Sequence, residues 1–555
     1  MKWWQKTVVY ECYPKSFLDT KGQGTGTIRG IIEKLDDLKK LGVGAIWLTP
    51  VYRSPMKDNG YDVADYYDID PSFGTMTDME ELILQAKKRE IGIVMDLVLN
   101  HTSDQNAWFQ KSKQSEDNPK SDWYIWRDAK ADGSAPANWR SIFGGSAWTW
   151  CEERKQYYLH TFASCQPDLN WKNPEVRKEA SRIAEYWIDK GVDGFRIDAI
   201  TYIRKPDIFE DGPVDGEDGL SSIHPLTANQ PGILDYLKEF RSGIPEKGND
   251  GREVFMVAEA NGVSAEELPQ WTGKNGVFDM LLEFSHVDLQ FQNGEIWCRP
   301  TSWKLTDLKK ALNDSEKSTA DDGWYPVFFE NHDQPRSINH YFHDDQNVVE
   351  KAKVLGMILY TMRGTPFLYQ GEELGYTNVK WHSINDYDDI SSHGQYAFAL
   401  KEGCTEKEAL QCVHDWSRDN ARTPMQWDDS ENAGFTTGKP WLPVHQNYRD
   451  QNAEKESEDP DSVLSWYRKL TKIRKQEPAL TEGDYEPVLE EEDSILGFYR
   501  RKENETVLVL TNFTDRDVDY DVSLSAGMEC ILSNETYKEG ILHPYQAVLL
   551  KKNNP

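Results

Sequence analysis

Short apolar runs alternate with amphipathic helical stretches along most of the chain. Eight of these runs are short and bounded by turn residues, which is typical of strands buried in a parallel sheet. They cover residues 8–14, 43–50, 91–100, 194–198, 254–260, 278–284, 324–332 and 366–371. Eight strands alternating with helices predict an α/β fold, the (β/α)8 TIM barrel, because that number closes a parallel sheet on itself.

Two of the intervening stretches carry clear helix signals. Thr77 and Glu80 have the residue types and spacing of a capping box. Asn173 followed by Pro174 has the chemistry of a helix start. Apolar residues spaced on one helical face follow both signals, so we expect both helices to pack on the sheet.

Two segments break the alternation of strands and helices. The stretch between the third and fourth strands is far longer than a simple crossover helix, which predicts a small inserted domain after strand 3. Beyond residue 477, short alternating runs predict a C-terminal antiparallel β domain. The predicted boundaries are 1–100 and 172–477 for the barrel, 101–171 for the inserted domain and 478–555 for a C-terminal β-sandwich.

The charge balance narrows the range of partners. Among 555 residues, 63 are basic and 94 acidic, which gives a net charge of −31. Such a field repels polyanions, so we expect no nucleic acid and no anionic membrane as partners, whereas a neutral small molecule is not disfavoured. No apolar run approaches the roughly 20 residues of a membrane-spanning helix, and the first residues show no secretory leader.

Cysteine usage points to the compartment. Seven cysteines are scattered along the chain without a Cys-x-x-Cys pair, which fits a reducing cytoplasm and neither a disulfide framework nor a zinc site. We therefore expect a cytoplasmic protein that is a monomer or a weak oligomer.

Ionisable side chains end four of the predicted strands. Arg196 and Asp198 are two residues apart on one strand, so their side chains project from the same face. Three other strands end near His101, at Glu259 and at Asp333. Because a barrel gathers the carboxyl ends of its strands at one rim, these groups are expected to meet there.

Three carboxylates at one rim disfavour one another's ionisation. At least one should therefore have a raised pKa, while we expect Arg196 to hold Asp198 ionised, as a nucleophile requires. One protonated and one ionised carboxyl group is the pair that glycoside hydrolysis needs. A metal site is the competing interpretation, because carboxylates and histidines also bind cations, but Arg196 and the aromatic-rich loops favour a sugar.

Five motifs identify a family resemblance that covers essentially the whole chain. They lie at residues 96–101 (DLVLNH), 166–170 (QPDLN), 194–198 (GFRID), 259 (E) and 331–333 (NHD). With them the chain resembles glycoside hydrolase family 13, the α-amylase superfamily, and within it the oligo-1,6-glucosidase and α-glucosidase group. The resemblance implies a retaining reaction through a covalent glucosyl-enzyme, with Asp198 as nucleophile, Glu259 as general acid/base and Asp333 as transition-state stabiliser. The nucleophile and acid carboxyl groups should then lie about 5 Å apart.

The resemblance also implies a binding site for the terminal glucose of a small oligosaccharide. Asp62 and Arg418 match a pair that holds the far hydroxyls of this sugar and closes the pocket, which implies attack from the non-reducing end. The other residues that the resemblance places at the sugar are Tyr61, His101, Phe162, Gln166, Arg196 and His332.

Two positions depart from the family pattern. Many relatives bind a cation in the loop after the first strand, but here the ligand positions hold Asp19, Lys21, Gln23 and Thr27. One carboxylate cannot replace the several oxygens that Ca²⁺ requires, so we predict no metal, no cofactor, and the ammonium of Lys21 near the cation position.

The second departure is Ala199, which follows the nucleophile. In this group a valine there accompanies preference for α-1,6 bonds, and smaller residues accompany α-1,4 or mixed preference. We predict that Ala199 enlarges the region around the leaving sugar, so that α-1,6 substrates are retained and other linkages are tolerated.

Three alternatives share the architecture. Trehalose-6-phosphate hydrolase needs added Lys or Arg beside the second sugar, and Pro167 here matches the oligoglucosidase pattern instead. Sucrose isomerase carries an arginine-rich loop that residues 337–342 lack. A non-catalytic sugar-binding or transporter-associated protein generally lacks the catalytic acids, all of which this chain retains.

Overall fold

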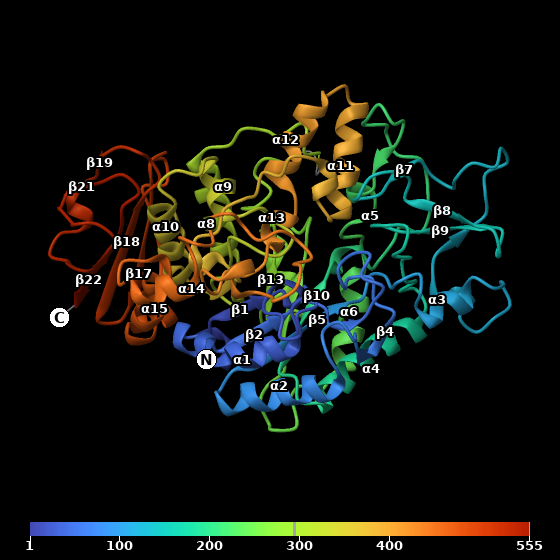
Figure 1. The fold of residues 1–555 in the computed structure, drawn as a ribbon, viewed down its shortest axis with the longest axis horizontal. Helices are drawn as coiled ribbons and strands as arrows, with labels where there is room; N and C mark the ends of the chain where they lie inside the picture. The colour runs from blue at the N-terminus through green and yellow to red at the C-terminus, as the bar shows by residue number, and fades with distance from the viewer. Residues whose placement is uncertain (292–295, 554–555) are drawn as a thin grey trace.

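A barrel of parallel strands forms the centre of the molecule in the computed structural model, which describes residues 1–291 and 296–553 (Figure 1). The strands follow the order β13-β12-β10-β5-β2-β1-β15-β14, and every neighbouring pair is parallel. All eight predicted strands are present, although the sixth and seventh are shorter than expected. Their bounds are β1 (Val9–Cys12), β2 (Ala45–Leu48), β5 (Gly92–Val98), β10 (Gly194–Asp198), β12 (Phe255–Glu259), β13 (Met280–Leu282), β14 (Pro326–Val327) and β15 (Thr365–Tyr369).

Alternation along the strands fills the interior of the barrel and aims the polar groups at its rim. Trp47, Val94, Phe255 and Val257 belong to one buried apolar cluster inside the barrel. Glu259 is two residues beyond Val257, so its side chain projects from the same inner face at the carboxyl end of β12. The apolar core therefore ends where the acidic groups begin.

Helices pack side by side around the sheet, as the alternating pattern predicts. Neighbouring pairs are α4 with α6, α1 with α2, α1 with α15, and α10 with α15. Their bounds are α1 (Ile28–Leu41), α2 (Met76–Lys88), α4 (Pro174–Asp189), α6 (Ile233–Ser242), α10 (Val348–Thr361) and α15 (Val463–Gln476).

The two predicted helix starts have different outcomes. Helix α4 begins as expected, with Asn173 as its N-cap. Helix α2 begins earlier than expected, because Thr75 caps it and forms the capping box with Asp78. The prediction from Thr77 and Glu80 is therefore wrong in register by two residues: two overlapping stretches carry the same residue types, and the chain uses the first.

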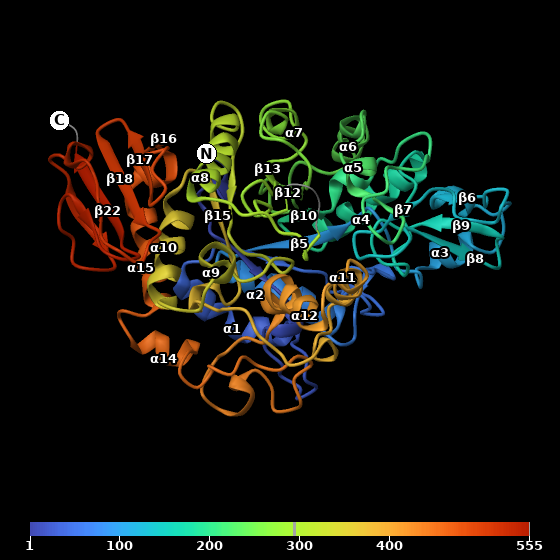
Figure 2. The same cartoon turned by 90° about the horizontal axis from the view of Figure 1, so that it is seen from above.

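An inserted segment between β5 and β10 lies at one end of the molecule, opposite the C-terminal sheet (Figures 1 and 2). It contains α3 (Ala107–Ser112) and a three-stranded sheet of β6 (Trp126–Arg127), β9 (Gln156–Leu159) and β8 (Trp148–Cys151). Its strand β7 (Trp139–Arg140) pairs with β11 (Ser221–Ser222), which follows β10. The insertion is thus joined to a later loop as well as to its own ends.

An antiparallel sheet ends the chain, as predicted. Its order is β16-β17-β18-β22-β20, with bounds Asp484–Val488, Ile495–Lys502, Glu505–Asn512, Ala547–Asn553 and Glu529–Ser533. A helical hairpin that the sequence pattern did not single out, α11 (Ile390–Lys401) and α12 (Glu406–Trp416), follows β15 (Figure 1). Within the described ranges, no helix has both the length and the apolar character needed to cross a bilayer.

A buried ion pair connects the insertion to the barrel. The Lys205 ammonium lies 2.9 Å from Asp168 Oδ2 and donates to Asn100 Oδ1 at 2.9 Å and Thr161 Oγ1 at 3.2 Å. Asp168 and Thr161 belong to the inserted segment, Asn100 follows β5, and Lys205 follows β10. The side chains of Lys205 and Asp168 are 4% and 0% exposed, so this cation holds three segments together in a site that water cannot screen.

Replacing Lys205 by methionine should destabilise the protein by about 3–5 kcal/mol, because the Asp168 carboxylate would stay buried without its cation. Thermal unfolding measures the change as a lowered Tm. Lys172→Met is the matched control: Lys172 pairs with Asp207 at an exposed site, where a loss of about 0–1 kcal/mol is expected. Equal Tm values for the two variants would show that the Lys205 contact does not hold the insertion.

Candidate active site

One guanidinium joins three carboxylates at the rim of the barrel. Arg196 Nη1 donates to Asp96 Oδ1 and Oδ2 at 2.8 and 2.9 Å and to Asp198 Oδ1 at 2.7 Å, and Nη2 donates to Glu259 Oε2. The three acids stand on β5, β10 and β12, which are neighbours in the sheet. Arg196 is 1% exposed, so its charge acts on them without competition from bulk water.

Burial raises the pKa values of these acids. Burial is the largest cause at Glu259, and with the charges of Asp198 and Asp333 it raises the pKa of that carboxyl group to about 8 despite Arg196. The same balance raises the pKa of Asp198 to about 7 and that of Asp96 to about 6. Burial thus opposes the effect of Arg196 on the pKa of Asp198, and that Asp198 is ionised when it reacts stays a prediction.

Asp333 has the opposite electrostatic environment. Arg422 Nη2 donates to its Oδ1 at 2.6 Å, and Arg418 Nη1 donates to the same atom at 3.4 Å. Burial by itself would raise the pKa of Asp333, but the guanidinium groups of Arg418 and Arg422 lower it well below its usual range. Asp333 therefore stays ionised in the pH range in which Glu259 holds a proton.

Two aromatic rings form a wall beside these acids. The Tyr61 and His332 rings are stacked, with centroids 5.0 Å apart and planes 3° from parallel. Tyr61 donates its hydroxyl to Asp96 Oδ2 at 2.8 Å, and His332 Nδ1 lies 2.6 Å from Glu11 Oε1. Burial lowers the pKa of His332 well below its usual value, so the ring is neutral. Its Nε2 is buried and makes no hydrogen bond to the described residues, which suits a ligand hydroxyl.

Gln166 and His101 continue this polar wall. Gln166 Nε2 donates to Asp58 Oδ2 at 2.8 Å and lies 3.1 Å from His101 Nε2. The edge of His101 meets the Phe162 ring with centroids 5.3 Å apart. The structure thus brings together most of the residues that the sequence predicts to bind glucose.

The partner of Arg418 differs from the expected one. Arg418 Nη2 lies 2.9 Å from Asp58 Oδ1 and 2.6 Å from Asp389 Oδ1, and it forms no ion pair with Asp62. Asp62 instead accepts hydrogen bonds from the Ser54 hydroxyl at 2.8 Å and from two backbone amides at 3.1 Å each. Asp62 therefore stabilises its own turn, and Asp58, four residues earlier, is the carboxylate that faces Arg418. That Asp62 itself binds the sugar stays a prediction.

Ala199 occupies a strained position directly after β10. Its backbone is left-handed, with φ 44° and ψ 40°, a region that costs a residue with a Cβ atom about 1–2 kcal/mol. Its amide donates to Glu259 Oε2 at 3.4 Å. Ala199 also lines the cleft with Phe162, Glu259 and Asp333, so the small side chain lies at the position predicted to affect linkage.

Sequence reasoning missed Arg422, Asp58 and Asp389 as parts of the site. Arg418 and Arg422 bracket α13 (Asp419–Arg422), and their spacing of four residues places both on one helical face toward Asp333. That spacing is a signal that the sequence contains. The parts played by Asp58 and Asp389 depend on contacts between distant loops, which no local pattern reveals.

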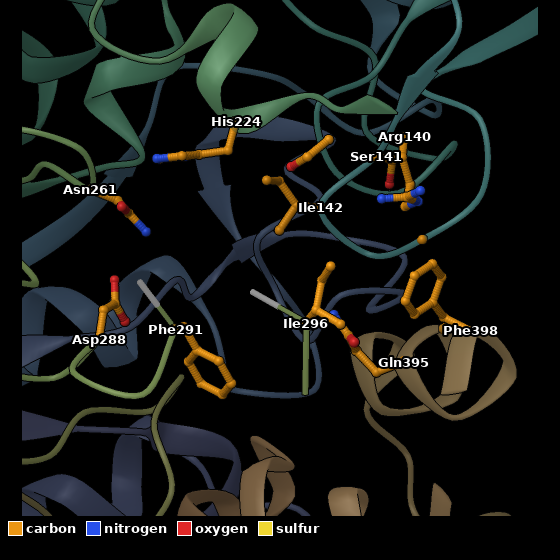
Figure 3. A pocket seen from close by; sticks show the side chains of 13 residues that line it. Arg140, Ser141, Ile142, His224, Asn261, Asp288, Phe291, Ile296, Gln395 and Phe398 are labelled. Atoms are coloured by element: carbon orange, nitrogen blue, oxygen red, sulfur yellow. The ribbon is translucent and has the colours of Figure 1, made fainter. Parts of the chain in front are cut away.

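The cleft widens into an outer chamber lined by the insertion, the loop after β12 and α11 (Figure 3). Arg140 stands in its wall, but Asp215 and Asp218 each accept a hydrogen bond from the guanidinium at 2.6 Å. Burial lowers the pKa of His224, which keeps that ring neutral. Other lining residues are Ile142, Asn261, Asp288, Phe291, Ile296, Gln395 and Phe398.

The loop after β1 satisfies its carboxylate internally. Asp19 accepts hydrogen bonds from the amides of Lys21 at 2.8 Å and Gly24 at 2.7 Å and from the Thr436 hydroxyl at 2.6 Å. Lys21 reaches Asp19 through its backbone and has an exposed side chain, whereas Thr27 caps α1. Gln23 is exposed. That this loop binds no cation stays a prediction.

Carboxyl groups with raised and lowered pKa values beside an aromatic wall, at the rim of a parallel barrel, are the arrangement expected of an enzyme that cleaves carbohydrates. The chain belongs to the α-amylase family of glycoside hydrolases, because the alpha amylase catalytic domain matches residues 11–483.

Two curated relatives cover nearly all of the chain. It is 43% identical to the oligo-1,6-glucosidase of Parageobacillus thermoglucosidasius and 41% identical to the trehalose-6-phosphate hydrolase of Bacillus subtilis, with 100% of this chain and 99% of each relative covered.

Two solved structures share the whole architecture. The isomaltulose synthase of Protaminobacter rubrum is 39% identical, with a TM-score of 0.94 and 99% of both chains covered. The trehalose-6-phosphate hydrolase of Bacillus licheniformis is also 39% identical, with a TM-score of 0.89, covering 99% of this chain and 100% of that one.

The pH dependence of kcat/KM should be bell-shaped. Activity is expected to fall below a pH of about 7, as Asp198 becomes protonated, and above a pH of about 8, as Glu259 loses its proton. An aryl glucoside with a strongly acidic leaving group needs no proton on departure, so its alkaline limb should weaken. Identical alkaline limbs for the aryl glucoside and a disaccharide would assign that limb to another group.

Proposed function

We propose that the protein is a retaining α-glucosidase that releases glucose from the non-reducing end of short α-glucosides. Isomalto-oligosaccharides with α-1,6 bonds are the proposed main substrates, and other linkages are tolerated. The observation that carries this proposal is the shared guanidinium: Arg196 contacts both Asp198 and Glu259, one carboxyl group to attack and one to donate a proton.

The proposed reaction has two steps. The Asp198 carboxylate attacks the anomeric carbon and forms a glucosyl ester, while Glu259 protonates the departing oxygen. Glu259 then removes a proton from water, which attacks the ester and releases glucose. Contact with one guanidinium keeps the two carboxyl groups close, and the covalent route requires about 5–5.5 Å rather than the wider spacing of inverting enzymes.

Attack at the chain end is supported by the closed side of the pocket. The ion pair between Arg418 and Asp58 is buried, and Gln166 braces the second oxygen of Asp58. Arg418 also reaches Asp333, so the ion pair stands directly behind the reacting groups. We therefore expect the pocket to end at this ion pair, so that the bound glucose is the last of its chain, which fits release of one glucose at a time.

Charge in the outer cleft favours neutral sugars over phosphorylated ones. Among the described residues that line the cleft and the chamber, the arginines are Arg140 and Arg418, and each is paired with at least two carboxylates. Phosphate recognition instead needs cations whose charge is available to the ligand. Trehalose-6-phosphate hydrolysis, the activity in one relative's name, is therefore the second candidate.

A panel of isomaltose, maltose, sucrose and trehalose 6-phosphate tests the choice, with Glu259→Gln as the inactive control. We expect isomaltose to be cleaved with a kcat/KM at least about tenfold above that of trehalose 6-phosphate, because the cleft offers the phosphate no unpaired cation. Hydrolysis confined to the phosphorylated sugar would overturn the proposal. Isomaltulose as the main product from sucrose would identify a sucrose isomerase instead.

Ala199→Val should raise the preference for isomaltose over maltose by about 10-fold or more, a typical effect of added methyl groups in a binding pocket. The measurement is the ratio of the two kcat/KM values. Ala199→Gly is the matched control, since it keeps the left-handed backbone accessible without adding volume. An unchanged ratio in the valine variant would remove Ala199 from the control of linkage.

A further inference from the structure

A second cavity lies between the insertion and the barrel. Its volume is about 500 Å³, which is within the usual range of small-molecule sites. Its walls come from the insertion, the loop that follows β10, the first residues of α4, and Tyr236 of α6. The residues that line it are all different from those that line the catalytic cleft and the outer chamber. The cavity is therefore a separate candidate binding site.

Three arginines of this cavity share one arrangement, in which the guanidinium group lies over an aromatic ring. The pairs, with the distance from the guanidinium carbon to the ring centre, are Arg127 with Phe209 at 4.4 Å, Arg154 with Trp126 at 4.5 Å and Arg204 with Tyr236 at 5.1 Å. Contact with a ring face holds the plane of a guanidinium group and leaves its N–H edge available for hydrogen bonds. The rings thus orient the three groups without neutralising them.

The three guanidinium groups also lack carboxylate partners. In the part of the chain that the structure describes, none of them forms an ion pair, and Arg204 makes no hydrogen bond. Arg127 donates to the backbone oxygen of Trp126 at 2.7 Å, and Arg154 donates to backbone oxygens and to the neutral Gln156 side chain. Burial lowers the pKa values of Arg127 and Arg154, so both charges are partly removed from water without an anion to offset the cost.

The charge balance of the cavity favours an anion. Its two lysines are already paired with aspartates, and two further carboxylates, Glu116 and Asp122, stand in the wall. Three arginines against these two carboxylates leave one positive charge in excess. Asn173 and Pro174 add the positive end of the α4 helix dipole. This local excess contrasts with the net charge of −31 of the whole chain.

We propose that this cavity binds a small metabolite through a phosphate group. A phosphate monoester carries nearly two negative charges at neutral pH and three acceptor oxygens, so it can accept hydrogen bonds from more than one guanidinium group. A neutral sugar is disfavoured, because arginines already cover ring faces of the lining on which a sugar would stack. The cavity volume leaves room for the organic part of the molecule beside its phosphate.

The proposed site adjoins the contacts that hold the insertion to the barrel. Lys205 is part of the lining, and its ammonium donates to Asn100, whose Nδ2 lies 3.2 Å from His101 Nδ1. Arg127 belongs to the insertion and Arg204 to the loop after β10, so an anion held by both would span the same joint. Such a ligand should raise the Tm of the protein, because it binds the folded state only.

Isothermal titration calorimetry of the full-length protein at low ionic strength tests the site without measuring activity. The probes are inorganic phosphate, glycerol 3-phosphate and, as the uncharged control, glycerol. We expect glycerol 3-phosphate to bind in a one-to-one ratio with a Kd of about 1 mM or lower, and we expect this affinity to fall as salt is added. A lower Kd for glycerol 3-phosphate than for inorganic phosphate would identify a phosphate ester as the ligand, whereas equal values would identify the free ion.

Substitutions locate the binding in this cavity. Arg127→Gln combined with Arg204→Gln should raise the Kd at least about tenfold, because charged hydrogen bonds to the phosphate are lost. Arg53→Gln combined with Arg182→Gln is the matched control, since it changes the net charge equally at two exposed arginines outside the cavity, and it should leave the Kd unchanged.

A single substitution keeps the test available if the double variant fails to fold. Arg127 has an exposed side chain, so Arg127→Gln should fold and should still raise the Kd about threefold or more. The proposal would be overturned if neither phosphate probe bound, if glycerol bound as tightly as its phosphate ester, or if the cavity variants bound no more weakly than the control.

Discussion

The contact of one buried guanidinium with three carboxylates is the constraint on which the site depends. Arg196 touches Asp96, Asp198 and Glu259, and a single positive charge cannot neutralise three negative ones away from water. Burial therefore favours the protonated form of each acid over an excess of negative charge, and it raises the pKa values of all three. The raised pKa that suits Glu259 to its proposed role as the acid is thus a consequence of burial and charge balance at the barrel rim.

A second cluster supplies the opposite balance a few residues away. Asp333 faces Arg418 and Arg422, so cations exceed anions around it, and the carboxylate stays ionised. Arg418 also connects this cluster to Asp58 and Asp389, which come from the loop after β2 and from the start of α11. Arg418 therefore contacts both the closed end of the proposed glucose pocket and the start of the helix that lines the outer chamber.

Local sequence signals predicted the frame of the molecule well and its exact boundaries less well. The apolar run predicted that Glu259 ends a strand, as it does in β12, and Asn173 marked the start of α4. The start of α2 was ambiguous, because Thr75 with Asp78 offers the same capping chemistry as the predicted pair, Thr77 with Glu80. Local rules identify the kind of element, and tertiary packing decides which of two overlapping capping boxes begins the helix.

By itself, the sequence determined the barrel and the acids at its rim, because strand periodicity and the parallel order of strands follow from nearest neighbours along the chain. Only the tertiary structure decided that Asp58 rather than Asp62 faces Arg418, and that Lys205 joins the insertion to the barrel. These contacts join loops that are distant in sequence. Their partners are set by how the loops pack across the barrel rim, and no local pattern of residues carries that information.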